Sequence, residues 1–156
     1  PDEDQIKQDV IDAAFAAWFA LNEFLLDPHN DDKLVGIART REGAALDRAI
    51  ELATTYRVKN LAERTHPEFP AKLELSENSV VLNLDEGTAV VEYCRLGSNV
   101  WVEVAANRDG SDLVLDETIN SYLEQDTFEI SDGVWKKVNG VSLFKFDGEM
   151  TCAPDN

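Results

Sequence analysis

Few residues of this 156-residue chain have the type and spacing that a catalytic site requires. Its two histidines, His29 and His66, each stand beside a proline in a predicted connection. A catalytic histidine must lie within hydrogen-bond reach of a partner or of a substrate. Nothing in the sequence places either one so, and we expect both to be solvated loop residues.

Acidic residues in the second half of the chain are the other candidates for acid–base chemistry. Glu92, Glu103, Glu124 and Asp126 alternate with apolar residues in predicted strands, so we expect all four to face solvent. A strand phase that differs by one residue would bury them instead. A buried carboxylate with a raised pKa is then the open alternative. We assign no catalytic residue.

Metal and cofactor motifs give no positive signal. The segment 107–112, which leads to Asp116, loosely resembles a calcium loop. The spacing of an EF-hand would place Ala105 at its first ligand position, where no oxygen ligand exists. We therefore predict a polar loop. The chain also has no zinc-type spacing, glycine-rich phosphate loop, Gly-x-Ser-x-Gly or His-Glu-x-x-His motif. We predict neither a metal nor a cofactor.

The two cysteines, Cys94 and Cys152, are candidates for a disulfide. Cys94 lies on a predicted strand, and Cys152 lies in a tail, residues 151–156, that would otherwise be loose. A bridge would pin this tail to the sheet and stabilise the fold by roughly 4 kcal/mol. Two unrelated thiols are the alternative. We favour the bridge, because an exposed thiol is a liability, and a bridge implies an oxidising compartment outside the cytoplasm.

Aromatic side chains are the candidates for binding a ligand. Phe15, Trp18 and Tyr56 lie on predicted helices that cover a sheet, and Tyr93 lies on its predicted inner face. Ligand pockets are mostly apolar with a few polar groups, so these four residues could line one. An ordinary hydrophobic core is the alternative.

Composition limits the classes of partner. With 44% apolar residues and this length, the chain fits a single domain, residues 1–156, and no apolar run is long enough to span a bilayer. It has 31 acidic and 14 basic residues, a net charge of −17, which repels nucleic acids and anionic lipids. A mildly basic segment, residues 33–72, lies between two acidic ones. It either attracts its acidic neighbours or forms an anion-binding face.

Hydrophobic periodicity predicts helices first and strands afterwards. Apolar residues recur every three or four positions over 4–26, 31–39 and 41–64, which indicates helices. An antiparallel sheet is predicted over about 71–147. Its first strand bends near 76–78, its hairpin turns lie at 97–98 and 132–133, and one long or broken strand spans 113–131. This order favours an α+β fold, an antiparallel sheet with helices on one face.

Short motifs in this order resemble the nuclear transport factor 2-like (cystatin-like, SnoaL-like) superfamily. Residues 132–138, Asp-Gly-Val-Trp-Lys-Lys-Val, are similar to the signature of its last hairpin. Three further segments resemble exported, lipoprotein-like members from high-GC Gram-positive bacteria: residues 88–94, residues 40–46, which fit the entry to the second helix of those proteins, and Gly-x-x-x-Cys-Ala at 148–153. The resemblance covers nearly the whole chain.

This resemblance implies two or three helices packed on a cone-like curved sheet that holds a small apolar ligand, and a secreted or envelope-anchored protein. A lipid anchor upstream of Pro1 is left open. We expect a non-catalytic domain that binds a small apolar molecule or a protein partner. The superfamily also contains isomerases, dehydratases and hydrolases, so an acid–base enzyme of this fold is the first alternative. Dimerisation through an outer sheet face that carries Trp101 is the second.

Overall fold

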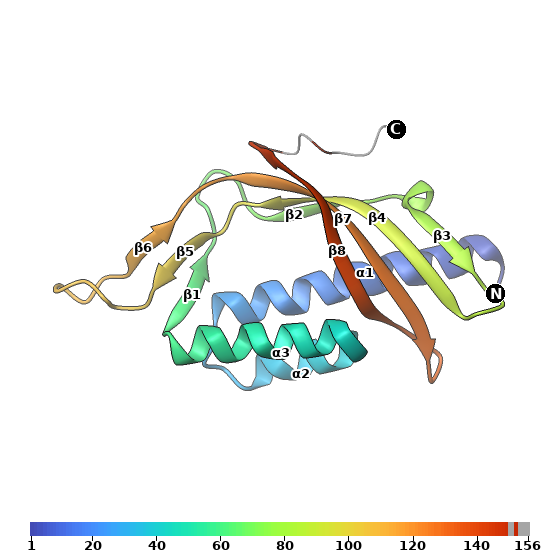
Figure 1. The fold of residues 1–156 in the computed structure, drawn as a ribbon, viewed down its shortest axis with the longest axis horizontal. Helices are drawn as coiled ribbons and strands as arrows, with labels where there is room; N and C mark the ends of the chain where they lie inside the picture. Colours follow the sequence, from blue (N-terminus) through green and yellow to red (C-terminus); the bar gives the residue numbers. More distant parts are fainter. Residues whose placement is uncertain (150–151, 153–156) are drawn as a thin grey trace.

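The computed structural model describes residues 1–149 and Cys152, and it has helices at the N-terminal end and antiparallel strands after them (Figure 1). The predicted α+β class is confirmed. The helices are α1 (Glu3–Leu26), α2 (Asp32–Thr40) and α3 (Gly43–Val58), and a 3-10 turn, η1, spans Glu77–Ser79. The strands are β1 (Leu61–Arg64), β2 (Lys72–Glu74), β3 (Val80–Asn83), β4 (Thr88–Gly97), β5 (Val100–Glu103), β6 (Leu113–Asp116), β7 (Asn120–Ser131) and β8 (Val134–Asp147).

Helix α1 has a clear start and stop in the sequence. The Asp2 side chain accepts a hydrogen bond from the backbone nitrogen of Gln5 at 2.9 Å, which caps the first turn. Glu3 and Asp4 lie at the positive end of the helix dipole. The helix ends at Leu26, shortly before Pro28, which cannot continue it.

Helix α3 is shorter than predicted. The sequence pattern extends the helix to residue 64, but α3 ends at Val58, and Asn60 has a left-handed φ of 54°. Asparagine tolerates this conformation better than most residues, so it forms the turn. Residues 61–64 then form β1, where Leu61 and Ala62 are buried. A few apolar residues in a short segment fit the period of a helix and that of a strand equally well. The helical pattern of α3 therefore extended through the turn at Asn60 into β1.

The strands form two sheets, and the predicted hairpin at 97–98 is wrong. One sheet has the order β1-β5-β6, and the other has the order β2-β4-β7-β8 with β3 also on β4. In the described structure β4 pairs with β7, and β5 pairs with β1 and β6, so residues 97–99 carry the chain from one sheet to the other. The chain crosses back between β6 and β7, so the strand predicted over 113–131 is broken there (Figure 1).

The second predicted hairpin is confirmed. Ser131 pairs with Val134, and Asp132 and Gly133 between them both have positive φ, 52° and 77°. Two successive positive φ values are what a tight two-residue hairpin needs. The register of β7 against β8 shifts twice, between Leu123 and Glu124 and again between Thr127 and Phe128. These irregularities flank the segment of β7 that carries the site described below.

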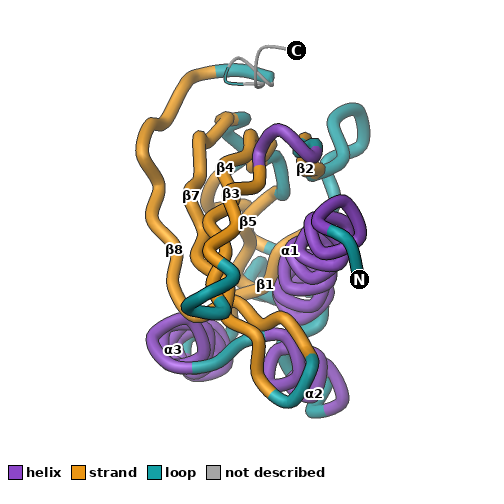
Figure 2. Tube along the Cα trace, turned by 90° about the vertical axis from the view of Figure 1, so that its right-hand side faces the viewer, coloured by secondary structure: helices purple, strands orange, loops and turns teal. Residues whose placement is uncertain are grey.

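Two apolar clusters hold the helices and the larger sheet together. The first lies between α1 and the five-stranded sheet and includes Val10, Val91 and Phe128, all fully buried. The second joins the three helices around Phe24 and Ile37. In Figure 2, α1 runs along one side of the sheet while α2 and α3 lie below it. No helix of the described residues is long and apolar enough to cross a membrane.

Candidate ligand-binding cavity

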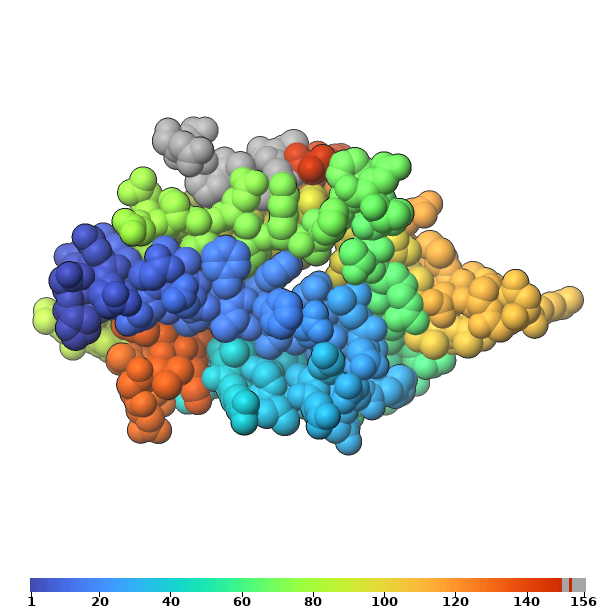
Figure 3. All heavy atoms as spheres, turned by 180° about the vertical axis from the view of Figure 1, so that it is seen from behind, coloured from blue at the N-terminus to red at the C-terminus, as the bar shows by residue number. Residues whose placement is uncertain are grey.

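A cavity of about 500 Å³ lies between α1 and the joints where the chain passes from one sheet to the other. Ligand pockets usually have roughly 300–1,000 Å³. Seen from behind, the surface is open between α1, in blue, and the green chain that follows β1 (Figure 3). Five aromatic side chains contribute to its wall: Trp18, Tyr56, Tyr93, Trp101 and Tyr122.

The cavity brings together three of the four predicted ligand-binding residues. Trp18, Tyr56 and Tyr93 all line it. Phe15 does not, because it lies on an outer face of α1 with 39% of its surface exposed. The middle of α1 is apolar nearly all round, so its sequence did not reveal which face points inward. That the three lining residues bind a ligand stays a prediction.

Trp101 belongs to the same wall. Its ring stacks on that of Tyr56 with 6.0 Å between centroids, and both rings line the cavity. Trp101 is nevertheless 38% exposed, so dimerisation through this residue stays a prediction. β5 leaves the larger sheet at residues 97–99, so its faces could not be assigned by continuing the alternation of β4.

A buried carboxylate stands in the cavity, which corrects the expectation that Asp126 faces solvent. Asp126 is 3% exposed and its Oδ2 accepts a hydrogen bond from the Tyr93 hydroxyl at 2.6 Å. The Lys137 ammonium lies 2.9 Å from the same oxygen. The backbone of Gly140 packs directly against the other oxygen, Oδ1. A side chain at this position would overlap that oxygen. Burial and the Asp126 charge together raise the pKa of Tyr93 well above its usual range, so this phenol stays protonated.

Arg41 is a second buried charge beside this group, and sequence reasoning did not single it out. It is 3% exposed and lines the cavity. Its Nη1 donates to the carbonyl oxygen of Ala17 at 2.7 Å and to Thr40 Oγ1 at 3.3 Å. The backbone at Arg41 bridges to Lys137, which holds the two basic residues next to each other. Burial lowers the pKa of Arg41, while the Asp126 charge opposes that shift.

Glu124 is likewise buried, and the expectation that it faces solvent is wrong. Both Nε and Nη2 of Arg95 donate to its Oε1, at 3.1 and 2.9 Å, and Ser142 Oγ donates to Oε2 at 2.8 Å. The Arg95 guanidinium also lies 4.3 Å from the centre of the Tyr122 ring. This carboxylate is therefore fully engaged by its neighbours.

A third polar group lies toward the three-stranded sheet. The Tyr56 hydroxyl donates to Glu63 Oε2 at 2.5 Å, and Asn99 Nδ2 donates to Glu63 Oε1 at 3.2 Å. Asn99 also donates to Asn22 Oδ1 of α1 at 2.8 Å. Burial and the charge of Glu63 raise the pKa of Tyr56. The cavity thus has aromatic walls and three sets of paired polar groups.

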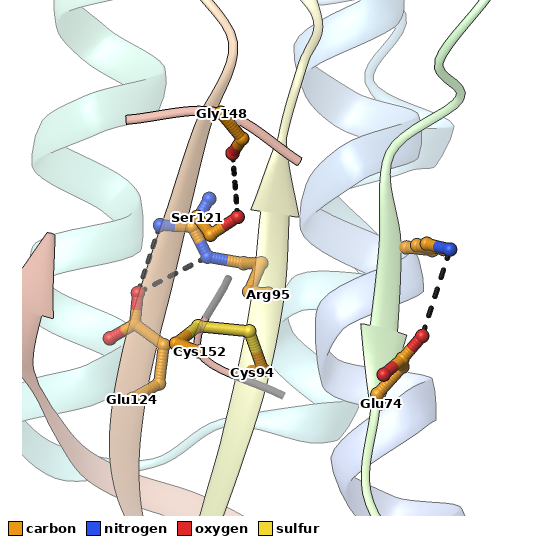
Figure 4. The surroundings of a disulfide bond; sticks show 8 residues. Glu74, Cys94, Arg95, Ser121, Glu124, Gly148 and Cys152 are labelled. Carbon is orange, nitrogen blue, oxygen red and sulfur yellow. Dashed lines mark hydrogen bonds and ion pairs between the residues drawn. A yellow bond between two sulfur atoms is a disulfide. The ribbon is translucent and has the colours of Figure 1, made fainter. Parts of the chain in front are cut away.

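The predicted disulfide is confirmed and lies behind this wall. Cys94 is joined to Cys152, with 5.5 Å between Cα atoms, and Cys94 is fully buried. Because successive residues of a strand point to opposite faces, Cys94 points away from the cavity that Tyr93 and Arg95 face. Figure 4 shows the bond next to the Arg95–Glu124 pair and the Ser121–Gly148 hydrogen bond of 2.7 Å.

The remaining predicted candidates lie elsewhere. His29 is exposed, and His66 Nδ1 accepts two backbone hydrogen bonds at 3.1 Å in its own loop; neither lines the cavity. Glu92 is exposed as predicted, and Glu103 is half-buried outside the cavity. Within the described part of the chain, no cluster of His, Cys, Asp or Glu could hold a metal ion.

We expect the two buried phenols to make the fold sensitive to alkaline pH. Unfolded tyrosines lose their protons above about pH 10, whereas Tyr56 and Tyr93 keep theirs in the folded chain. The folded state then holds more protons, so stability is complete below pH 10 and falls as the pH rises, by about 1.4 kcal/mol per pH unit for each phenol. Urea titrations at pH 8 to 11 should show a shallower decline for Y56F/Y93F than for the wild type. Equal slopes would contradict this reading.

Comparison with known proteins supports the fold alone. No family model matches the chain, and no curated protein matches it. Among solved structures, the intermembrane space region of the chloroplast protein ARC6 is similar, with a TM-score of 0.65 and 15% identity over 95% of this chain and all of that one. A de novo designed β-sheet protein also matches, at 15% identity over 92% of this chain and 93% of that one, with a TM-score of only 0.42.

Proposed function

We propose that this chain is a non-catalytic domain that binds a small molecule with an apolar body in its cavity. The observation that carries the proposal is the cavity of about 500 Å³ with five aromatic side chains and a few paired polar groups in its wall. Pockets for small molecules have this size and this mixture of apolar surface with fixed polar groups. Trp18 from α1 and Trp101 from β5 would contact the ligand from different elements.

The state of the ionisable groups supports binding over proton transfer. The Tyr93 proton is held by Asp126, and Asp126 is also paired with Lys137. Glu124 is held by Arg95 and Ser142. A general base must be able to take a proton from a substrate near the working pH, and carboxylates engaged in this way are poorly suited to that task.

An acid–base enzyme of the same fold, of isomerase, dehydratase or hydrolase type, is the alternative that one observation favours. Such an enzyme needs an ionisable residue inside the cavity, and Asp126 and Glu124 both lie there. The two functions differ in what happens to the ligand. A bound molecule that is recovered chemically unchanged after prolonged incubation with the protein supports binding, and a converted one supports catalysis.

We further propose that the chain works outside the cytoplasm, either secreted or anchored to the cell envelope. The Cys94–Cys152 disulfide supports this location, because such bonds persist in oxidising compartments. Membership of the nuclear transport factor 2-like superfamily, and of its exported branch, is part of the same proposal. The order of helices followed by antiparallel strands supports it.

Binding of a protein partner or of a second copy of the chain is the other alternative. Residues 141–146, in the second half of β8, favour it. β8 is an edge strand, and its apolar residues Val141, Leu143, Phe144 and Phe146 are exposed. Exposed apolar edges of this kind pair readily with another chain.

A native mass spectrum of freshly purified, unreduced protein tests the proposed function. We expect a monomer that carries an extra mass, and we expect this mass to leave on denaturation. W18F and Y93F should each lower the bound fraction, since both side chains line the cavity. A bare dimer would favour assembly through β8. A bound mass that both variants retain in full would contradict a site in this cavity.

A further inference from the structure

The Arg41 guanidinium has hydrogen-bonding capacity that the protein does not use. Its two hydrogen-bond acceptors, Ala17 O and Thr40 Oγ1, both receive hydrogen bonds from Nη1. Nε and Nη2 have no hydrogen-bond partner among the described residues, and no carboxylate of these residues lies within ion-pair distance of Arg41. Neither atom is among the fully buried side-chain atoms that lack a partner, so both keep some accessible surface. Arg41 lines the cavity, so a bound molecule can supply the missing acceptors.

The carboxylates near Arg41 are engaged by other residues. Asp126 carries one negative charge, and it is already paired with Lys137. Tyr93 is neutral because burial raises its pKa. Glu124 and Arg95 cancel each other. Glu63 is bonded to Tyr56 and Asn99 on the side of the three-stranded sheet, and Asp116 is exposed. Arg41 is thus the one of the three basic residues in the wall with no carboxylate in direct ion-pair contact among the described residues, although the wall as a whole has four acidic residues, Glu63, Asp116, Glu124 and Asp126.

The free edge of the guanidinium fits one class of ligand group. Nε and Nη2 project two parallel N–H bonds, which match the two oxygens of a carboxylate. We propose that the cavity binds an amphipathic carboxylate, with its carboxylate on Arg41 and its apolar body against α1 and the aromatic walls. A single negative charge balances Arg41, whereas a phosphate monoester would bring a second negative charge close to Asp126.

The apolar body has a matching surface. Leu21 and Leu25 of α1 and Leu52 of α3 line the cavity together with Trp18 and Tyr56. Leu21 and Leu25 are one helical turn apart, so they form a continuous stripe. This inference rests on the proposed function and adds to it the chemical class of the ligand.

Calorimetric titration with four probes of equal chain length tests the inference on the intact protein. The probes are octanoate, octanol, octylamine and octyl phosphate. We expect octanoate to bind at least tenfold more tightly than octanol or octylamine, because a bidentate, charge-assisted pair has that effect. Octyl phosphate should bind more weakly than octanoate. This selectivity is measured on the wild type and needs no variant to fold.

Variants then assign the selectivity to Arg41. R41Q should lower octanoate affinity at least tenfold and leave octanol affinity unchanged, while R41K should fall between R41Q and the wild type. R39Q is the matched control, because Arg39 is exposed on α2 and does not line the cavity. Binding of octanol, octylamine or octyl phosphate as tight as that of octanoate, or R41Q equal to R39Q, would overturn this inference alone. If no probe binds, the proposed function falls with it.

Discussion

Replacing Cys152 by alanine should lower the free energy of unfolding by about 4 kcal/mol. The Cys94–Cys152 bond joins residues separated by 58 positions, and cross-links of that span restrict the unfolded chain strongly. The bond also ties the chain after β8 to β4 across the intervening β7, whose Ser121 hydroxyl donates a hydrogen bond to Gly148 O. Cys152 is the residue to change, because Cys94 is fully buried and its replacement would also leave a small void.

The control uses reduction of the wild type. Urea unfolding of the wild type in excess dithiothreitol should match unfolding of C152A, and dithiothreitol should have no further effect on C152A. A wild type that loses less than about 1 kcal/mol on reduction would show that the bond contributes little, since strain in a folded protein can offset the entropic gain.

Asp126→Ala should destabilise the fold by about 3 kcal/mol. Removing one partner of a buried ion pair leaves the other charge uncompensated, which typically costs 3–5 kcal/mol. Here Lys137 and Arg41 would both lose their nearby negative charge, and the Tyr93 hydroxyl would lose its acceptor. The lower end of the range applies because the Lys137 side chain is 20% exposed and can regain water. Thermal and urea unfolding measure the effect.

Two further variants separate charge from packing. D126N keeps the shape and an acceptor for Tyr93, so it isolates the loss of charge, and D126A/Y93F should cost less than the sum of the two single changes. E92Q is the matched control on the exposed face of β4 and should change stability by less than about 0.5 kcal/mol. A D126A variant as stable as E92Q would contradict the account of this buried group.

The sequence pattern was sufficient to predict the features that depend on local chemistry. Helices α1 and α2 follow from apolar spacing and from Pro28, and the turn at Asp132 and Gly133 follows from residues that accept positive φ. The disulfide could be inferred because a tail with a lone cysteine needs an anchor. For the helices and the turn, a few neighbouring residues determine the outcome.

The cavity depends on long-range features that such patterns do not contain. Glu124 and Asp126 face inward with Phe128, because the fully buried Phe128 sets the phase of β7, and polar partners from β4 and β8 make the burial of both carboxylates tolerable. These partners are distant in the sequence, so alternation alone placed both acids in solvent. Arg41 belongs to no catalytic or ligand-binding motif. The only sequence signal for it was the basic segment 33–72, which left an anion-binding face as an open alternative.

The three tryptophans allow the most direct test that the cavity is a binding site. Trp18 and Trp101 line the cavity, whereas Trp135 lies in the core between α1 and the larger sheet. Two-dimensional NMR resolves each indole N–H signal, and W18F, W101F and W135F assign them. Adding octanoate should move the signals of Trp18 and Trp101 and leave that of Trp135 in place. Signals that do not move at millimolar octanoate, or a shift confined to Trp135, would contradict a ligand site in this cavity.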